Sequence, residues 1–250
     1  GVQTCALPIF PTDCPTRERS GWSGDWQLYA PTAAYLYDVD GFSRKFLADV
    51  VLDQHPDGRI ANISPTEPLG GFDSRIEYTN GGPGWGDVIV SAPLDAYLAY
   101  GTTEAMEQCW DAAERWVAFC ADRAATQRHE TRVTRTPEPA EHEAYLADTG
   151  FAFGEWFEPN VPLDFLALRT SDQANVGTAY LHRSARQMAE IAAVLGKDSD
   201  VVHRYEELAA NAKRAWQAEC MNADGSLVVD TQASYVRALH FGLLPEELRP

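Results

Sequence analysis

The segment TDCPTRERSGWSGDWQ, residues 12–27, crowds residues that could do chemistry into a stretch too broken to be a helix. It holds two aspartates, one glutamate, two arginines and two tryptophans, and Gly and Pro interrupt it. A solvated loop needs no tryptophan. A core segment does not accept five charged side chains, because charges are almost never buried unless they are paired. The composition therefore predicts that this segment belongs to a site.

Two later segments repeat the combination of glycine, an aromatic ring and an acid. PGWGD spans residues 83–87 and precedes an apolar, helix-like run, and FGEWF spans residues 153–157 within a long polar stretch. If the helices between these loops are arranged as successive hairpins, the loops at one end converge. We therefore expect the three segments to contribute to one pit.

A sugar would explain the combination of residue types. The apolar C–H face of a pyranose packs on an indole ring, while carboxylates and arginine bind its hydroxyl groups. Two carboxyl groups that flank a glycosidic bond can also supply acid and base catalysis and stabilise an oxocarbenium-like transition state. The three loops thus indicate a protein that acts on carbohydrate.

Each of these residues also has a plain structural interpretation. The three loop tryptophans would serve equally well as core anchors, and Asp25 and Asp87 as helix N-caps, where aspartate is favoured. Arg17 and Arg19 beside Glu18 would then form ordinary surface ion pairs. Because the same composition occurs in three loops, we favour a site over these alternatives.

Composition excludes several classes of partner. The 250 residues are 45% hydrophobic and 11% aromatic, which suffices for a large core. With 20 Lys and Arg against 37 Asp and Glu, the net charge is −17, so nucleic acid and anionic membranes are unfavourable partners. No apolar run is long enough to span a bilayer. The oligomeric state is left open.

The cysteines follow no zinc or redox pattern. Cys5 apart, Cys14, Cys109, Cys120 and Cys220 form no CxxC pair and no spacing with histidine typical of zinc. We expect reduced, structural cysteines and no metal, which slightly favours the cytoplasm.

Helical periodicity dominates the chain, so the fold is predicted to be all-α. The apolar spacing predicts three pairs of helices and a seventh helix. The first pair breaks near Asp38 to Gly41 and the second at Gly101. The predicted ranges are 26–54, 88–126, 174–220 and 231–244. Long polar segments, 55–87 and 127–173, lie between the pairs, and within the second RTPEPAEHEAY is predicted to be a surface insertion. The pattern indicates an (α/α) toroid, left incomplete with about seven helices.

The first nine residues, GVQTCALPI, match no signal peptide, helix or strand pattern. They resemble the in-frame translation of a sequencing adapter. We therefore expect residues 1–9 to be non-native and residues 10–250 to be a partial catalytic domain, cut at both ends.

The motifs in this order resemble those of the bacterial α-L-rhamnosidases of glycoside hydrolase family 78, the six-hairpin glycosidases. The likeness begins at TDCPTRERSGWSGD and continues through GRIANISP, GWGD, GEWF and LHFGLLPEELR, from Pro11 to Pro250. It implies an (α/α)6 barrel, no cofactor and inverting hydrolysis of terminal α-L-rhamnose from glycosides or polysaccharides.

The resemblance also implies roles for single residues. The family's general acid falls on Glu18, which must then hold a proton near neutral pH. The other matching positions contact the sugar, and they are Asp13, Arg17, Trp22, Asp25, Trp85, Asp87 and Trp156. Glu155 stands where the family commonly has aspartate, so its role stays open. We expect Arg17 or Arg19 to turn towards another acid or the substrate, and Trp22 or Asp25 to face Glu18.

One part of the family's machinery has no counterpart here. The general base of the family is a glutamate in a later loop, and no acid after residue 220 lies in a matching motif. The acids in that stretch read as turn, cap and helix-start residues, namely Asp224, Asp230, Glu246 and Glu247. Two alternatives stay open: a six-hairpin glycosidase for a different sugar, and a sugar-binding or structural barrel in which Glu18 protonates nothing.

Overall fold

A computed structural model of the chain describes residues 10–14, 16–66, 76–154 and 171–248. Within these ranges the secondary structure is helical, and strand-like pairing is limited to two isolated bridges, Trp22 with Ile63 and Met221 with Leu227. The predicted all-α class is confirmed. Residues 1–9, predicted to be non-native, lie outside the described residues. No described helix combines the length and apolar character needed to cross a membrane.

The chain divides into two compact units, Gly1–Trp116 and Val117–Pro250. The division falls inside helix α5, Glu104–Thr126. Each unit has its own buried side chains, so the two are described separately.

The first unit is built from α1 (Ser23–Leu36), α2 (Asp40–Leu52), α4 (Val88–Tyr100) and the first part of α5. All four helices were predicted, although α1 begins three residues earlier than its apolar pattern. Gly101 ends α4 at φ 72°, a left-handed conformation that glycine adopts without steric cost. A short 3-10 turn, Glu77–Thr79, precedes the loop that leads into α4.

Side-chain contacts join the helices of the first unit. The Trp26 ring of α1 packs edge-on against Phe42 of α2 at 5.1 Å between ring centroids. Helices α2 and α5 run in the same direction, because Arg44 pairs with Glu104 near their starts and Gln54 donates to the Ala112 carbonyl further along. These contacts thus hold α1 against α2 and α2 against α5.

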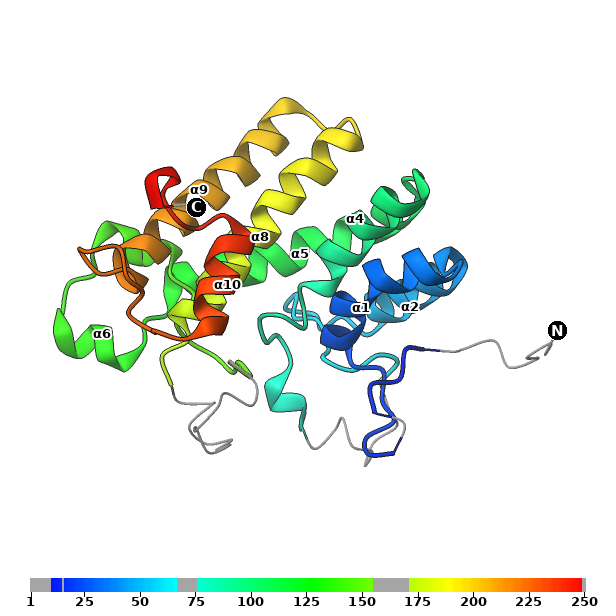
Figure 1. The fold of residues 1–250 in the computed structure, drawn as a ribbon, viewed down its shortest axis with the longest axis horizontal. Helices are drawn as coiled ribbons and strands as arrows, with labels where there is room; N and C mark the ends of the chain where they lie inside the picture. The colour runs from blue at the N-terminus through cyan, green and yellow to red at the C-terminus, as the bar shows by residue number, and fades with distance from the viewer. Residues whose placement is uncertain (1–9, 15, 67–75, 155–170, 249–250) are drawn as a thin grey trace. The chain divides into compact units, whose positions relative to one another are not determined.

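The second unit centres on a helical hairpin of α8 (Ala174–Val194) and α9 (Ser199–Cys220), which lie side by side and antiparallel. Helix α10 (Gln232–Phe241) packs against α8 (Figure 1). Met188, Trp216 and Leu243 are fully buried there. The predicted third pair and seventh helix are thus confirmed. The 3-10 turn Glu246–Leu248 follows.

A short helix in this unit was not predicted. Helix α6 spans only Glu130–Arg135, and the 3-10 turn Glu141–Tyr145 follows it. The prediction of a surface insertion over 135–145 was wrong at its end, because Glu143 is 3% exposed. Six residues carry too little apolar periodicity to reveal a helix, and charge pairing rather than apolar packing fixes this one.

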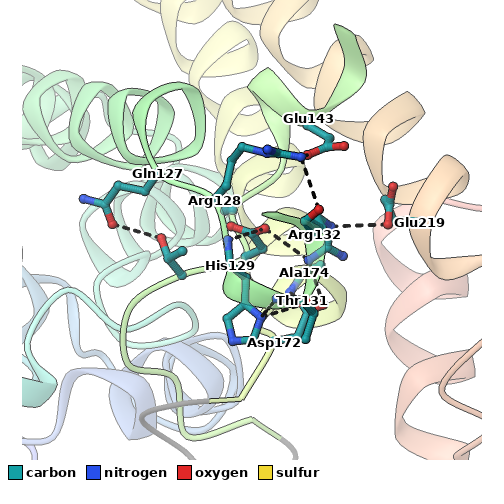
Figure 2. Close-up of polar contacts among 12 residues, drawn as sticks. Gln127, Arg128, His129, Thr131, Arg132, Glu143, Asp172, Ala174 and Glu219 are labelled. Carbon is teal, nitrogen blue, oxygen red and sulfur yellow. Dashed lines mark hydrogen bonds and ion pairs between the residues drawn. The ribbon is translucent and has the colours of Figure 1, made fainter. Parts of the chain in front are cut away.

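Helix α6 is held by the ion network drawn in Figure 2. Arg132 contacts Asp148 at 3.1 Å, Asp172 at 2.7 Å and Glu219 at 3.3 Å. Two nearby arginines extend the network: Arg128 pairs with Glu143, and Arg135 pairs with Glu219 through both terminal guanidinium nitrogens. Buried charges are tolerated when they are paired in this way, so the network fixes α6 against α9.

The network makes the stability of the second unit depend on pH. The hydrogen bonds from Arg135 and His142 and the charges of Arg132 and Arg135 outweigh the effect of burial and lower the pKa of Glu219 from 4.5 to about 2. A carboxyl group with a lowered folded-state pKa stabilises the fold above its unfolded value and loses that contribution as the pH falls through the folded value. We expect Glu219→Gln to make unfolding midpoints in urea less dependent on pH between 4.5 and 2. Glu206→Gln, on an exposed position of the same helix, should leave the wild-type slope unchanged. Equal slopes for all three proteins would contradict this assignment.

Candidate active site

The first predicted segment folds back on itself into a closed loop. Asp13 donates its N–H to the Ser20 carbonyl at 3.1 Å, and its side chain accepts from the Ser20 N–H at 3.0 Å. Between them Arg19 has φ 58°, a left-handed conformation that is uncommon outside glycine. Such a conformation persists only where surrounding bonds fix it. The Asp13–Ser20 pair thus fixes the backbone on both sides of Glu18.

Glu18 lies on this loop beside Arg17. Arg17 Nε donates to Glu18 Oε2 at 2.6 Å, and the side chains are 61% and 14% exposed, respectively. At least one of Arg17 and Arg19 was expected to turn away from Glu18, and in this structure Arg17 is directed at it. Because Arg17 is largely exposed, little packing holds it in that position.

Three carboxyl groups of the segment act on one another. One oxygen of Asp13, one oxygen of Glu18 and the Cys14 sulfur lie within 4.8 Å of each other. Burial opposes ionisation of Asp13, but hydrogen bonds from the backbone at Cys14 and Ser20 outweigh it and lower its pKa. Burial and the charges of Asp13 and Glu18 raise the pKa of Asp25, against the effect of Arg17. The carboxylates of Asp13 and Glu18 therefore both act on the ionisation of Asp25.

A short extended stretch holds the start of α1 behind this loop. Residues 60–64, from the motif GRIANISP, pair with residues 21–23 through the Trp22–Ile63 bridge. Ser64 donates to the Gly21 carbonyl at 2.9 Å, and Ser23 donates to the Asn62 carbonyl at 2.8 Å. A Cβ atom on Gly21 would lie 2.0 Å from the Ser64 carbonyl oxygen. Only glycine therefore allows the two backbones to approach this closely.

The second predicted segment reaches the same region of the first unit. The Trp85 ring lies against Gly24, where a Cβ atom would be 2.9 Å from the indole. Gln27 of α1 also donates to the Gly84 carbonyl at 3.2 Å. The structure thus brings the 83–87 turn beside Asp25 and the start of α1.

Asp87 has a different position from the one expected of a sugar ligand. Its side chain accepts from the Gly84 N–H at 2.7 Å and from Trp116 Nε1 at 3.2 Å, and the residue is 2% exposed. It precedes α4 but makes no side-chain capping bond. Asp87 therefore fixes the turn that carries Trp85, while its own oxygens are occupied by protein groups.

The third predicted segment is described only in part. Gly154 has φ 63°, and the residues before it, Phe151 and Phe153, are buried with their rings packed edge to face. Glu155 and Trp156 lie outside the described residues, so their expected part in the site stays a prediction.

Among the residues that the structure describes, two groups have donor atoms close enough to hold a cation. One is Asp13, Cys14 and Glu18, and the other is His142, Glu143 and Glu219. Arginine side chains already neutralise acids in both, Arg17 in the first and Arg128 and Arg135 in the second. Both carboxylates of the second group are thus paired with arginine, whereas in the first group Arg17 pairs with one of the two carboxylates, that of Glu18.

The sequence did not reveal the residues that support the site. Asn62, Thr79 and Asp87 are buried polar residues whose role appears only when the loops are seen together. One feature of the sequence could have indicated a supporting residue. Asn62 lies within the apolar stretch Ile60 to Ile63, where burying an unpaired amide would be costly.

The close approach at Gly21 gives a direct test of the local geometry. Gly21→Ala would place a methyl group on the Ser64 carbonyl, and we expect it to lower the free energy of unfolding by about 3 kcal/mol. Gly41→Ala is the matched control, because Gly41 lies in α2 with no atom near its Cβ position. It should raise stability by about 0.5–1 kcal/mol. Urea denaturation measures both, and equal effects of the two substitutions would contradict the described pairing.

Comparisons with known proteins identify the family of this chain. Residues 2–250 match the family described as the bacterial alpha-L-rhamnosidase 6 hairpin glycosidase domain. An alpha-L-rhamnosidase of Streptomyces avermitilis is 31% identical over 96% of the chain, and one of Formosa agariphila is 30% identical over 95%. The chain spans about a fifth of the length of these curated relatives, 20% and 23% respectively.

Solved structures show the same fold. A Streptomyces avermitilis alpha-L-rhamnosidase in complex with L-rhamnose superposes with a TM-score of 0.76 at 29% identity, over 96% of this chain and 20% of that one. An Aspergillus terreus alpha-L-rhamnosidase superposes with a TM-score of 0.75 at 26% identity, over 95% of this chain and 25% of that one. The match over nearly the whole chain shows that this protein belongs to the six-hairpin glycosidase domain family of the bacterial α-L-rhamnosidases.

Proposed function

We propose that this chain is the acid-bearing part of an α-L-rhamnosidase that removes terminal α-L-rhamnose with inversion. The observation that carries the proposal is the cluster of Asp13, Arg17 and Glu18 on one closed loop, within the segment that resembles the family's first motif. The general base is proposed to lie outside these 250 residues. The short span of the chain relative to its relatives supports that placement.

The substrate is proposed to be a rhamnose-containing glycoside or polysaccharide. A relative crystallised with L-rhamnose supports this choice of sugar. On this chain, Asp13, Asp25 and Arg17 would bind hydroxyl groups, and Trp22 or Trp85, both half-buried, would pack against the apolar face of the ring. Asp87 is assigned a positioning role, because its oxygens already accept from Gly84 and Trp116.

The proposed acid step depends on two opposing charges around Glu18. The positive charge of Arg17 favours the carboxylate, whereas the negative charge of nearby Asp13 favours the protonated acid. In this proposal the substrate draws the exposed Arg17 away, while Asp13 remains beside Glu18. Binding of the sugar would thus free the Glu18 carboxyl group to face the leaving oxygen.

Inversion sets the distance at which the missing base must stand. The base activates a water molecule on the face of the sugar opposite the leaving group. The two carboxyl groups are then about 6.5–9.5 Å apart, because that water must fit between the base and the sugar. Asp13 has a carboxyl oxygen within 4.8 Å of one of Glu18, which is too near to leave this room, and this supports a base elsewhere.

Two alternatives predict different behaviour. A six-hairpin glycosidase for another sugar would keep the fold and prefer a different monosaccharide. A sugar-binding barrel would bind L-rhamnose and perform no chemistry at Glu18. The Arg17–Glu18 ion pair favours the second alternative as long as Arg17 stays in place.

Calorimetric titration of the chain with single monosaccharides tests the proposed sugar specificity. We expect L-rhamnose to bind with a dissociation constant in the millimolar range, and L-fucose and D-glucose to bind at least tenfold more weakly. Asp13→Asn should weaken binding of L-rhamnose, because it removes an ionised hydroxyl acceptor and loosens the loop. Glu104→Gln, an exposed change on α5, serves as the control. Preferential binding of another sugar would contradict the proposed specificity.

Hydrolysis tests the role of Glu18. In a full-length enzyme that contains this chain, Glu18→Gln should lower turnover about 10²- to 10⁴-fold for glycosides with poor leaving groups, and far less for activated aryl rhamnosides. The reason is that an activated leaving group departs with little protonation. The present chain alone should turn over an aryl α-L-rhamnoside weakly or not at all. Robust hydrolysis by this chain would place the base within it, and wild-type turnover by Glu18→Gln would exclude Glu18 from the mechanism.

A further inference from the structure

Asn62 is a buried amide at the junction of the loops that carry the proposed site. The residue is 0% exposed, and it lies between Ala61 and Ile63, which are 1% and 2% exposed. An amide in such surroundings is costly unless its groups are hydrogen-bonded. The bonds that Asn62 makes therefore show what it connects.

The side chain of Asn62 binds the loop that precedes the 83–87 turn. Its Nδ2 donates to the Thr79 carbonyl at 2.9 Å and to Thr79 Oγ1 at 3.0 Å. Thr79 Oγ1 in turn donates to the Ile76 carbonyl at 2.7 Å. Because the Thr79 carbonyl can only accept, these contacts fix the orientation of the amide.

The main chain of Asn62 binds both neighbouring segments. Its carbonyl accepts from the Ser23 N–H at 2.8 Å and from Ser23 Oγ at 3.0 Å. Its N–H donates to Asn80 Oδ1 at 2.9 Å. One residue thus contacts the first turn of α1 on one side and residues 79–80 on the other.

Both partners of Asn62 lead directly to proposed site residues. Ser23 follows Trp22 and begins the helix whose first turn holds Asp25. Thr79 and Asn80 precede the turn that carries Trp85, whose ring lies against Gly24. A shift of the 79–80 segment would therefore move the Trp85 ring relative to Asp25.

We propose that Asn62 is a positioning residue, which sets the distance between the Trp85 turn and the start of α1. This inference rests on the proposed sugar-binding function, and it adds a residue that touches no substrate itself. Its side-chain amide is the part that acts, because the backbone bonds to Ser23 and Asn80 survive truncation of the side chain.

The experiment compares three variants of the whole chain. Asn62→Ala removes the amide, and Thr79→Val removes the hydroxyl partner from the other side of the same contact. Gln54→Ala is the matched control, since Gln54 Nε2 also donates to two backbone carbonyls of this unit, those of Gly58 and Ala112. Each is studied by hydrogen exchange and by titration with L-rhamnose, at a temperature where all are folded.

The two readouts separate positioning from general stability. We expect Asn62→Ala and Thr79→Val to speed exchange at residues 22–25 and 83–87, and to raise the dissociation constant for L-rhamnose about tenfold. Gln54→Ala should lower the unfolding midpoint but leave both the exchange in these two segments and the affinity for L-rhamnose unchanged. If Asn62→Ala does not fold, Thr79→Val carries the test.

Different results would contradict the positioning role of Asn62 and the proposed function. Unchanged exchange in both segments and unchanged affinity in the Asn62 and Thr79 variants would overturn the positioning role. If the wild-type chain binds no L-rhamnose, the proposed function is contradicted, and the exchange data still decide whether Asn62 links the two segments.

Discussion

The site depends on the backbone pairing between residues 21–23 and 62–64. Two hydrogen bonds, from Ser64 to Gly21 and from Ser23 to Asn62, place the start of α1 on an extended stretch. Gly21 makes this possible, since any side chain there would collide with the Ser64 carbonyl. The closed loop with Asp13, Arg17 and Glu18 ends where this pairing begins. The backbone contact therefore fixes the end of the loop, and the Asp13–Ser20 bonds fix the loop itself.

Two clusters of charge among the described residues differ in the exposure of their arginines. This difference indicates that one cluster stabilises the fold and that the other can take part in chemistry. Arg132 is 5% exposed and contacts three carboxylates, so it cannot leave without stranding buried charge. Arg17 is 61% exposed and contacts a single carboxylate, Glu18, among the acids of its loop. An exposed ion pair contributes little to stability and exchanges partners readily. The exposure of Arg17 thus explains why opposite charges are crowded into residues 12–27: a ligand can rearrange them.

The sequence predicted the long helices well and the supports of the site poorly. Apolar spacing revealed α8 and α9 because a face of 21 or 22 residues repeats its pattern many times. It missed α6, which is six residues long and is fixed by ion pairs with residues distant in sequence. Composition grouped the first two loops correctly. The family resemblance implied a sugar contact for Asp87, and no sequence pattern shows that its carboxylate accepts from Gly84 and Trp116.

The most direct measurement is a titration of the isotopically labelled chain with L-rhamnose, followed by the backbone amide signals in NMR spectra. In the proposed function the sugar lies against the closed loop and the Trp85 turn. We therefore expect shifts concentrated at residues 13–25 and 82–87, with signals of α9 and α10 left unchanged. Shifts confined to the second unit, or none at saturating sugar, would contradict it.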